Sequence, residues 1–316
     1  MTTTSSPAPA TARAATPPVR RRASFSRWRS RGGPAAVVLA LPAFLVFLYF
    51  AWGPIVRAVV MSFEKTNLVG PSIWVGLGNF TYVLADPLLP RAIVNTLWYA
   101  FLAFVFGFPL PILLAVFIAE VRKRSWVFSA LAYLPVVVPP VVSILLWKTF
   151  YDPGSSGTFN TVLGWFGVGP WPWLNSVHSA VPSIVLETTW ASAGTAVIIY
   201  LAALAGVRTE LYEAAELDGS GIWSRIWHIT LPQMRGVILI MLLLQIIGTM
   251  QIFTEPYIFT GGGPQNSTLT VLLMIYDYAF VNSDYGAATA LSVLLAVVLA
   301  LFSFAYQWLT RKWGTD

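Results

Sequence analysis

The sequence contains no cysteine and only two histidines among its 316 residues. The absence of cysteine excludes disulfide bonds, thiolate metal sites and cysteine nucleophiles. The two histidines, His178 and His228, lie far apart in the chain. We therefore do not expect a histidine-based metal centre.

Charged residues are scarce as well. They make up 10% of the chain, whereas hydrophobic residues make up 57% and the mean hydropathy is +0.70. A typical soluble domain has about 25% charged residues. The composition therefore predicts an integral membrane protein. The net charge of +6 does not indicate nucleic-acid binding, because the basic residues gather at the ends of apolar segments, as membrane topology requires.

The first 33 residues contain almost nothing that could form a core and are rich in Ala, Pro, Ser, Thr and Arg. This composition predicts a disordered basic tail, which we place in the cytoplasm. The apolar run that follows is too long for a signal peptide, so we expect it to be retained as a first membrane span. Residues 34–316 are then expected to form one transmembrane domain.

Several apolar segments are long enough to cross a bilayer, whose hydrocarbon core of about 30 Å needs roughly 20 helical residues. These segments lie at about 35–57, 92–119, 127–150, 180–206, 236–259 and 285–309. We therefore predict an all-α membrane protein with six transmembrane helices. Prolines in these segments indicate kinked or broken helices, which are tolerated at membrane depth only inside protein or beside a cavity.

The basic residues predict the orientation of the spans. With the N-terminal tail inside, the segments on that side hold 15 of the 19 Lys and Arg residues. The opposite side keeps Arg57, Lys65, Arg91 and Lys148. The positive-inside rule then predicts that both termini are cytoplasmic.

An acidic island interrupts the apolar chain at residues 207–235. Thr209 can cap a first helix, Gly219 supplies a left-handed stop, and Ser220 can cap a second helix that Pro232 ends. The expected result is a helix–turn–helix of two short amphipathic pieces beneath the membrane. A loop resting on lipid headgroups is the alternative, but acidic residues repel an anionic leaflet, so we favour docking to a protein.

The register of this island is specific. Three residues separate EAA from a glycine, and nine more separate that glycine from an I-x-LP sequence. This pattern resembles the signature loop of permease subunits in binding-protein-dependent ABC importers. The matching residues are Glu213, Ala214, Ala215, Gly219, Ile229, Leu231 and Pro232.

Other segments are similar to the carbohydrate-uptake branch of that family, in particular to the first permease of the maltose and glycerol-phosphate systems. They include the runs at 75–80, 95–96, 134–140 and 260–264, and the likeness covers about residues 36–312. Arg208 stands where many relatives have proline, and Ser220 where they have alanine. Neither difference alters the expected helix–turn–helix.

The resemblance implies a type I ABC importer permease fold and a division of labour. The EAA loop, with Asp218 beside its glycine, would be a coupling helix that seats in a cytoplasmic ATPase. The chain has no G-x-x-x-x-G-K-[ST] sequence, so we expect it to bind no cofactor and ATP and Mg²⁺ to bind to a separate subunit. The implied partners are a second permease, a dimer of ABC ATPases and an extracytoplasmic binding protein or lipoprotein, in a bacterial plasma membrane.

Polar residues inside a membrane are costly and are therefore candidates for function. On the fourth and fifth predicted spans they are Glu187, Trp190, Gln245 and Gln251. Planar hydrogen-bonding groups beside aromatic faces suit a sugar, so we expect these residues along a substrate path. Hydrogen bonding between helices, or with the partner permease, is the alternative.

Three further features lie near the outer side. Gly261, Gly262, Gly263 and Pro264 form either a flexible connection or, as the resemblance suggests, a docking surface for the binding protein. Glu255 is expected near the outer surface, where it could meet that protein. Asn95 starts the second span and is expected to be a cap or packing residue.

We therefore expect a transport subunit, not an enzyme, that passes a sugar delivered by a binding protein. Glycerol-phosphate or another polyol remains an alternative cargo. A self-contained transporter driven by an ion gradient is a weaker alternative, because such proteins need ionisable residues at mid-depth and the spans offer few beyond Glu187. A membrane-embedded enzyme would need clustered His, Asp or Ser residues, and none are apparent. The identity of the sugar does not follow from the sequence.

Overall fold

A computed structural model describes residues 33–121 and 125–311 of the chain. The predicted N-terminal tail lies outside the described residues, except for Gly33. The chain divides into two compact units, Met1–Val56 and Arg57–Asp316. The described part of the first unit is helical and comprises α2 (Gly33–Phe47), a π-helical turn η1 (Leu48–Trp52) and the start of α3 (Gly53–Met61).

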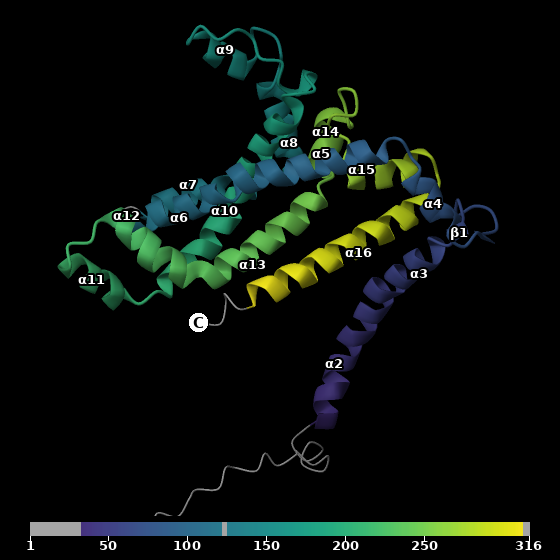
Figure 1. Cartoon of the computed structure of the whole chain (residues 1–316), viewed down its shortest axis with the longest axis horizontal. Helices are drawn as coiled ribbons and strands as arrows, with labels where there is room; N and C mark the ends of the chain where they lie inside the picture. The colour runs from purple at the N-terminus through teal and green to yellow at the C-terminus, as the bar shows by residue number, and fades with distance from the viewer. Residues whose placement is uncertain (1–32, 122–124, 312–316) are drawn as a thin grey trace, which may run out of the picture. The chain divides into compact units, whose positions relative to one another are not determined.

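The second unit is a helical bundle with one small hairpin (Figure 1). Its elements, in chain order, are β1 (Glu64–Lys65), β2 (Ile73–Trp74), α4 (Gly78–Leu84), α5 (Leu89–Leu102), η2 (Ala103–Gly107), α6 (Pro109–Glu120), α7 (Ser125–Val137), α8 (Pro140–Phe150), α9 (Thr158–Gly164), η3 (Trp173–Asn175), α10 (Ala180–Ala205), α11 (Thr209–Leu217), α12 (Ile222–Arg225), η4 (Ile226–Thr230), α13 (Leu231–Met250), α14 (Thr254–Thr260), α15 (Val271–Tyr276), η5 (Asp277–Val281) and α16 (Tyr285–Thr310). The antiparallel hairpin β1–β2 is a small departure from the all-α prediction.

Five helices in the described residues are long and apolar enough to cross a membrane. They span Ala35–Met61, Leu89–Glu120, Ala180–Ala205, Ile222–Met250 and Tyr285–Thr310. A bent pair, Ser125–Val137 with Pro140–Phe150, would make a sixth span if it were counted as one. The predicted fifth span, 236–259, is displaced, because the helix begins at Ile222 and breaks after Met250.

The helices α7 and α8 meet at an angle of 95°. Pro139 has the extended conformation, with φ −56° and ψ 134°, and it precedes a second proline. A residue before proline is disfavoured in the helical region, and proline lacks the N–H that would continue the helix. The proline pair thus accounts for the sharp elbow, and α8 extends away from the other long helices (Figure 1).

The helix α10 packs closely against its neighbours α6 and α7. Gly194 makes the approach to α7 possible, because a Cβ atom at this position would lie 2.3 Å from the main-chain oxygen of Ala132.

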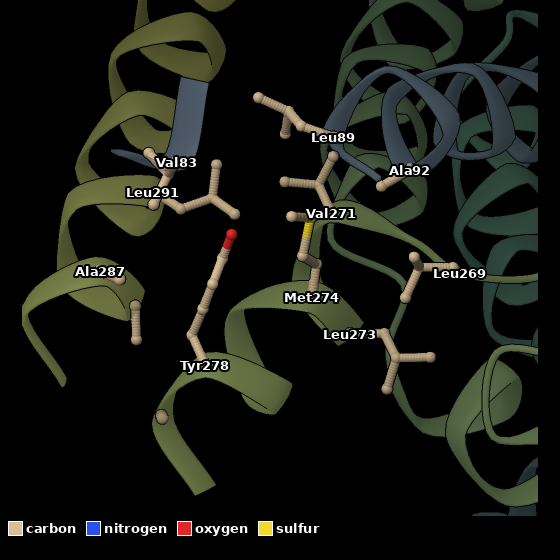
Figure 2. Packing of buried hydrophobic residues seen from close by; sticks show 12 residues of the cluster. Val83, Leu89, Ala92, Leu269, Val271, Leu273, Met274, Tyr278, Ala287 and Leu291 are labelled. Carbon is tan, nitrogen blue, oxygen red and sulfur yellow. The ribbon is translucent and has the colours of Figure 1, made fainter. Parts of the chain in front are cut away.

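A second core joins α4, α5, α15 and α16 at the opposite end of the bundle from α11. Figure 2 shows its side chains, with Tyr278 directed between Leu291 and Met274. The Tyr278 hydroxyl donates a hydrogen bond to the Asp86 carboxylate.

Candidate functional site

The acidic island forms the exposed helix α11, followed by a tight turn. Gly219 has φ +73°, the left-handed conformation that the sequence predicts. The N–H of Gly219 donates to the oxygen of Glu216 at 3.0 Å, and that of Ser220 donates to the oxygen of Ala215 at 2.8 Å. This pair of bonds is the Schellman arrangement, which satisfies the last carbonyl groups of a helix.

Two side-chain contacts fasten α11 to the helix that follows. The hydroxyl groups of Tyr212 and Thr230 lie 3.0 Å apart and share a hydrogen bond. Arg225 forms an ion pair with Glu216, and the Arg225 side chain is only 15% exposed. The two helices therefore form one preorganised unit.

The helix–turn–helix formed by α11 and the Gly219 turn nevertheless has few buried side chains. None of the residues of α11 is buried, and Leu217 beside the turn is 90% exposed. Glu213, Ala214 and Asp218 are exposed as well. A helix of 9 residues gains little stability alone, and most helical stability in proteins comes from packing of one face. The exposed helix α11 is thus suited to binding by another molecule.

The second helix differs from the prediction in both its start and its end. Gly221, not Ser220, is its N-cap, and Thr209 lies inside α11, whose cap is Arg208. Pro232 does not end the helix, which continues as one apolar helix from Ile222 to Met250. A π-helical turn, Ile226–Thr230, precedes the proline. Its wider ring relieves the clash that proline makes with the carbonyl four residues earlier. Ile229 and Leu231 are half-buried beside this turn, and Pro232 is exposed.

A cavity of about 680 Å³ lies between η2, α10, α13 and the chain that follows α13. Gln245 and Gln251 both line it. Gln245 donates from Nε2 to the main-chain oxygen of Ala103 at 2.8 Å, which also accepts a bond from the N–H of Phe108. Gln251 is exposed, and its Nε2 donates to the oxygen of Ile247 at 3.3 Å. Gln251 is therefore the freer of the two to meet a ligand.

Several lining residues were not predicted as part of a substrate path. The polar ones are Tyr99, Thr188, Thr189, Ser192, Thr195, Tyr200, Thr249, Thr254 and Glu255. Glu255 reaches the cavity because α13 ends at Met250 and the short helix α14 begins at Thr254. Tyr99 is fully buried, and its hydroxyl has no hydrogen-bond partner among the residues that the structure describes. The feature that marks Tyr99 is its unpaired hydroxyl, which the structure shows and the sequence does not.

Glu187 and Trp190 lie elsewhere and are absent from the cavity lining. Glu187 is 2% exposed and accepts a hydrogen bond of 2.7 Å from the Ser143 hydroxyl, across the interface of α10 with α8. Trp190 packs against Trp147, with ring centroids 5.4 Å apart. The structure thus brings two of the four predicted path residues together and gives the other two packing contacts.

The loop that contains residues 261–264 is closely held. Gly261 and Gly262 have φ values of +57° and +90°, which glycine adopts at low cost. The buried Thr268 hydroxyl lies 2.7 Å from the Thr260 hydroxyl and donates to the Gly263 oxygen at 2.8 Å. Asn95, expected to be a cap or packing residue, reaches the same loop from α5. This contact network favours a fixed surface over a flexible connection.

The described residues contain no group of three or more His, Asp or Glu side chains that could hold a metal ion. The geometry combines an exposed helical unit at one end of the bundle, a cavity within the bundle that has both polar and apolar lining residues, and a fixed loop after α14. These parts suit movement of a ligand through the bundle, driven from the exposed unit.

Comparison with known proteins gives the family context. The family model described as binding-protein-dependent transport system inner membrane component matches residues 107–315. The chain is 30% identical over 291 residues to the arabinooligosaccharides transport system permease protein AraP of Bacillus subtilis, covering 90% of this chain and 92% of the relative. It is 31% identical over 302 residues to the lactose transport system permease protein LacF of Rhizobium radiobacter, covering 92% and 98%.

A solved structure is similar over nearly the whole chain. It is a bacterial ABC transporter involved in the import of the acidic polysaccharide alginate, with a TM-score of 0.80 and 29% identity. The similarity covers 90% of this chain and 98% of that one. The same kind of transporter, solved in complex with an alginate pentasaccharide-bound periplasmic protein, also gives a TM-score of 0.80, at 28% identity.

Proposed function

The chain belongs to the family of inner membrane components of binding-protein-dependent transport systems, and we propose that it is the sugar-conducting permease subunit of an ATP-driven importer. Support for the cargo comes from relatives whose names specify arabinooligosaccharides and lactose. The hydrolysis of ATP is assigned to a separate subunit, so this chain is not itself an enzyme.

The observation that carries this proposal is the exposed unit formed by α11 and the Gly219 turn. It holds the EAA register, has no buried residue in α11, and is tied to α12 and η4 through the Glu216–Arg225 ion pair and the Tyr212–Thr230 hydrogen bond. Because α12, η4 and α13 form one continuous helix, a push on the unit is transmitted directly to the cavity wall. Seating of α11 in a groove of the ATPase would thus couple nucleotide-driven closure to opening of the bundle.

The remaining assignments are part of the same proposal, and the orientation rests on the distribution of basic residues. The unit formed by α11 faces the cytoplasm, together with both termini, in a bacterial plasma membrane. The loop at Gly261–Gly263 and Pro264 receives the binding protein or lipoprotein on the other side. A second permease completes the translocation path, and a dimer of ATPases drives it. The cavity beside Gln245 and Gln251 is the part of the path that this chain contributes.

Two alternatives make different predictions. An importer of glycerol-phosphate or another polyol would keep the ATPase coupling and change only the cargo. A secondary transporter driven by an ion gradient would need no ATPase, and its uptake would collapse with an ionophore while ATP is present.

The test uses the assembled complex of this chain with its second permease and ATPase. We expect Glu213→Lys to lower co-purification of the ATPase and sugar uptake together, because it reverses the charge of a motif residue on the exposed helix. The matched control is Glu210→Lys, which makes the same change on α11 outside the motif. Glu210 is exposed and pairs with its neighbour Arg208 at 3.4 Å. Normal ATPase association and normal uptake in Glu213→Lys would contradict the coupling assignment.

A further inference from the structure

The described side chains of the cavity wall include an acidic group and no basic group. Glu255 contributes a carboxyl group, and the described residues that line the cavity include no Lys, Arg or His. The other polar lining groups are hydroxyl and amide side chains. Two of the four basic residues predicted on the outer side are engaged elsewhere, because Arg57 pairs with Glu64 at 3.0 Å and Lys148 donates to the Ile258 oxygen at 3.2 Å. A ligand anion in this cavity would therefore find no positive partner on the described part of the wall that this chain contributes.

Hydroxyl and amide side chains supply the hydrogen-bonding groups of the cavity wall. A hydroxyl group of a ligand can pair with either kind, since a hydroxyl both donates and accepts. Gln251, Thr249 and Glu255 provide further acceptors and donors of the same kind around the space.

Burial of an unpaired charge is far more costly than burial of a hydrogen-bonded neutral group. A carboxylate or phosphate on the ligand would lose hydration on entering and would face Glu255 without a compensating cation. A protonated Glu255 still supplies no positive charge, and an ionised Glu255 adds repulsion to the penalty. An uncharged polyhydroxy ligand avoids this penalty and can pair with the wall.

We propose that the cavity selects uncharged sugars and rejects carboxylated and phosphorylated ones, with Glu255 as the specificity-determining residue. This inference rests on the proposed function, since it takes the cavity to be part of the substrate path. It favours an uncharged sugar over glycerol-phosphate as the cargo.

The absence of cysteine from the chain provides a direct test, because a single introduced thiol reports on one position. Gln251→Cys places the thiol in the cavity wall. Val69→Cys, at a side chain that is 92% exposed, is the reference. Each variant of the purified permease complex is treated with methanethiosulfonate reagents that carry either a trimethylammonium or a sulfonate group. Alkaline buffer favours the reactive thiolate form of the introduced cysteine and the ionised form of the Glu255 carboxyl group.

We expect the ratio of cationic to anionic reaction rates at Gln251→Cys to exceed that at Val69→Cys by about tenfold, since the Glu255 carboxylate lines the same cavity and attracts cations while it repels anions. Adding Glu255→Gln should return the ratio toward the reference. Glu210→Gln, the same change on the exposed helix α11, should leave it unchanged. A ratio equal to the reference, or one that Glu255→Gln does not alter, would overturn the inference.

The assay measures neither ATP hydrolysis nor uptake, so the two proposals can fail separately. If the complex couples ATP hydrolysis to uptake normally but shows no charge preference at Gln251→Cys, only the proposed selection of uncharged sugars is contradicted. If it shows the charge preference but Glu213→Lys leaves ATPase association and uptake normal, the coupling assignment is contradicted instead.

Discussion

The side-chain amide of Asn95 donates a hydrogen bond of 2.7 Å to the main-chain oxygen of Asn266, across 171 residues of sequence. It donates a second, of 2.9 Å, to the oxygen of Leu269. The adjacent Thr96 hydroxyl accepts from the N–H of Val271 at 3.1 Å. These bonds hold the loop after α14 against α5, so the side chain at position 95 fixes the surface proposed to receive the binding protein.

Asn95→Asp should therefore destabilise the protein, because the change removes both donors and places a carboxylate opposite two carbonyl oxygens. Loss of a buried hydrogen bond that leaves its partner unsatisfied costs about 1–3 kcal/mol. Thermal unfolding of the purified permease and protease cleavage within residues 260–270 are the measurements. Asn282→Asp, at an exposed position, is the control and should behave as the parent. Equal melting temperatures and equal cleavage for the two variants would contradict this role.

Gly219→Ala should weaken the coupling of ATP hydrolysis to uptake. A residue with a Cβ atom in the left-handed conformation costs roughly 1–2 kcal/mol, although the space around Gly219 is open. The strain would displace α11 from α12 without disturbing the spans. Uptake per ATP hydrolysed in proteoliposomes is the measurement, and Gly221→Ala is the control because Gly221 has φ −70°. An unchanged ratio in Gly219→Ala would show that the turn geometry is not needed.

Gly194→Ala should destabilise the bundle. The new methyl group would meet the Ala132 oxygen at 2.3 Å and the Tyr133 Cα at 2.9 Å, both of which are main-chain atoms that cannot rotate away. Overpacking of this kind typically costs about 1–3 kcal/mol. The control is Gly236→Ala on α13, where no atom lies within 4 Å of the added Cβ. We expect a lower melting temperature for the first variant only, and equal values would show that α7 and α10 can separate freely.

Gln251→Ala should lower sugar uptake by about two- to tenfold, the effect of losing one hydrogen bond of about 0.5–1.5 kcal/mol to a ligand. Stability should not change, since Gln251 is exposed. Trp190→Ala, by contrast, removes a ring packed on Trp147 and should lower the melting temperature. Uptake measured beside thermal unfolding separates the two effects. A melting temperature lowered by Gln251→Ala with no specific loss of uptake would assign this glutamine to packing.

Local signals in the sequence located the exposed helical unit and its turn, although the N-caps are Arg208 and Gly221 and not the predicted Thr209 and Ser220. The left-handed glycine at position 219 follows from the end of an amphipathic helix, and the structure has that conformation. Pro232 shows the limit of the same reasoning. A proline normally ends a helix, but the π-helical turn before it creates room for the ring, and no local pattern announced that turn.

The cavity was less accessible to sequence reasoning, because its members meet through long-range packing. The break after Met250 moved Glu255 from the expected outer surface into the cavity wall, and a span drawn continuously through 236–259 could not show this. Tyr99 reads as an ordinary aromatic residue of an apolar helix. Its unpaired hydroxyl becomes informative only when the surrounding side chains are in place. Glu187 stood out as a mid-span carboxylate, but Ser143 supplies its partner from a helix beyond the proline elbow.

That elbow has a consequence for the surrounding lipid. With 13 residues, α7 is about 20 Å long, whereas a bilayer core is about 30 Å thick. If α7 stands along the membrane normal, α8 lies nearly in the membrane plane and adds almost no height. The hydrophobic thickness of the protein is then smaller beside the elbow than beside α16, and the bilayer must thin there to match it. We expect the stability of the reconstituted protein to fall as the acyl chains of the host lipid are lengthened.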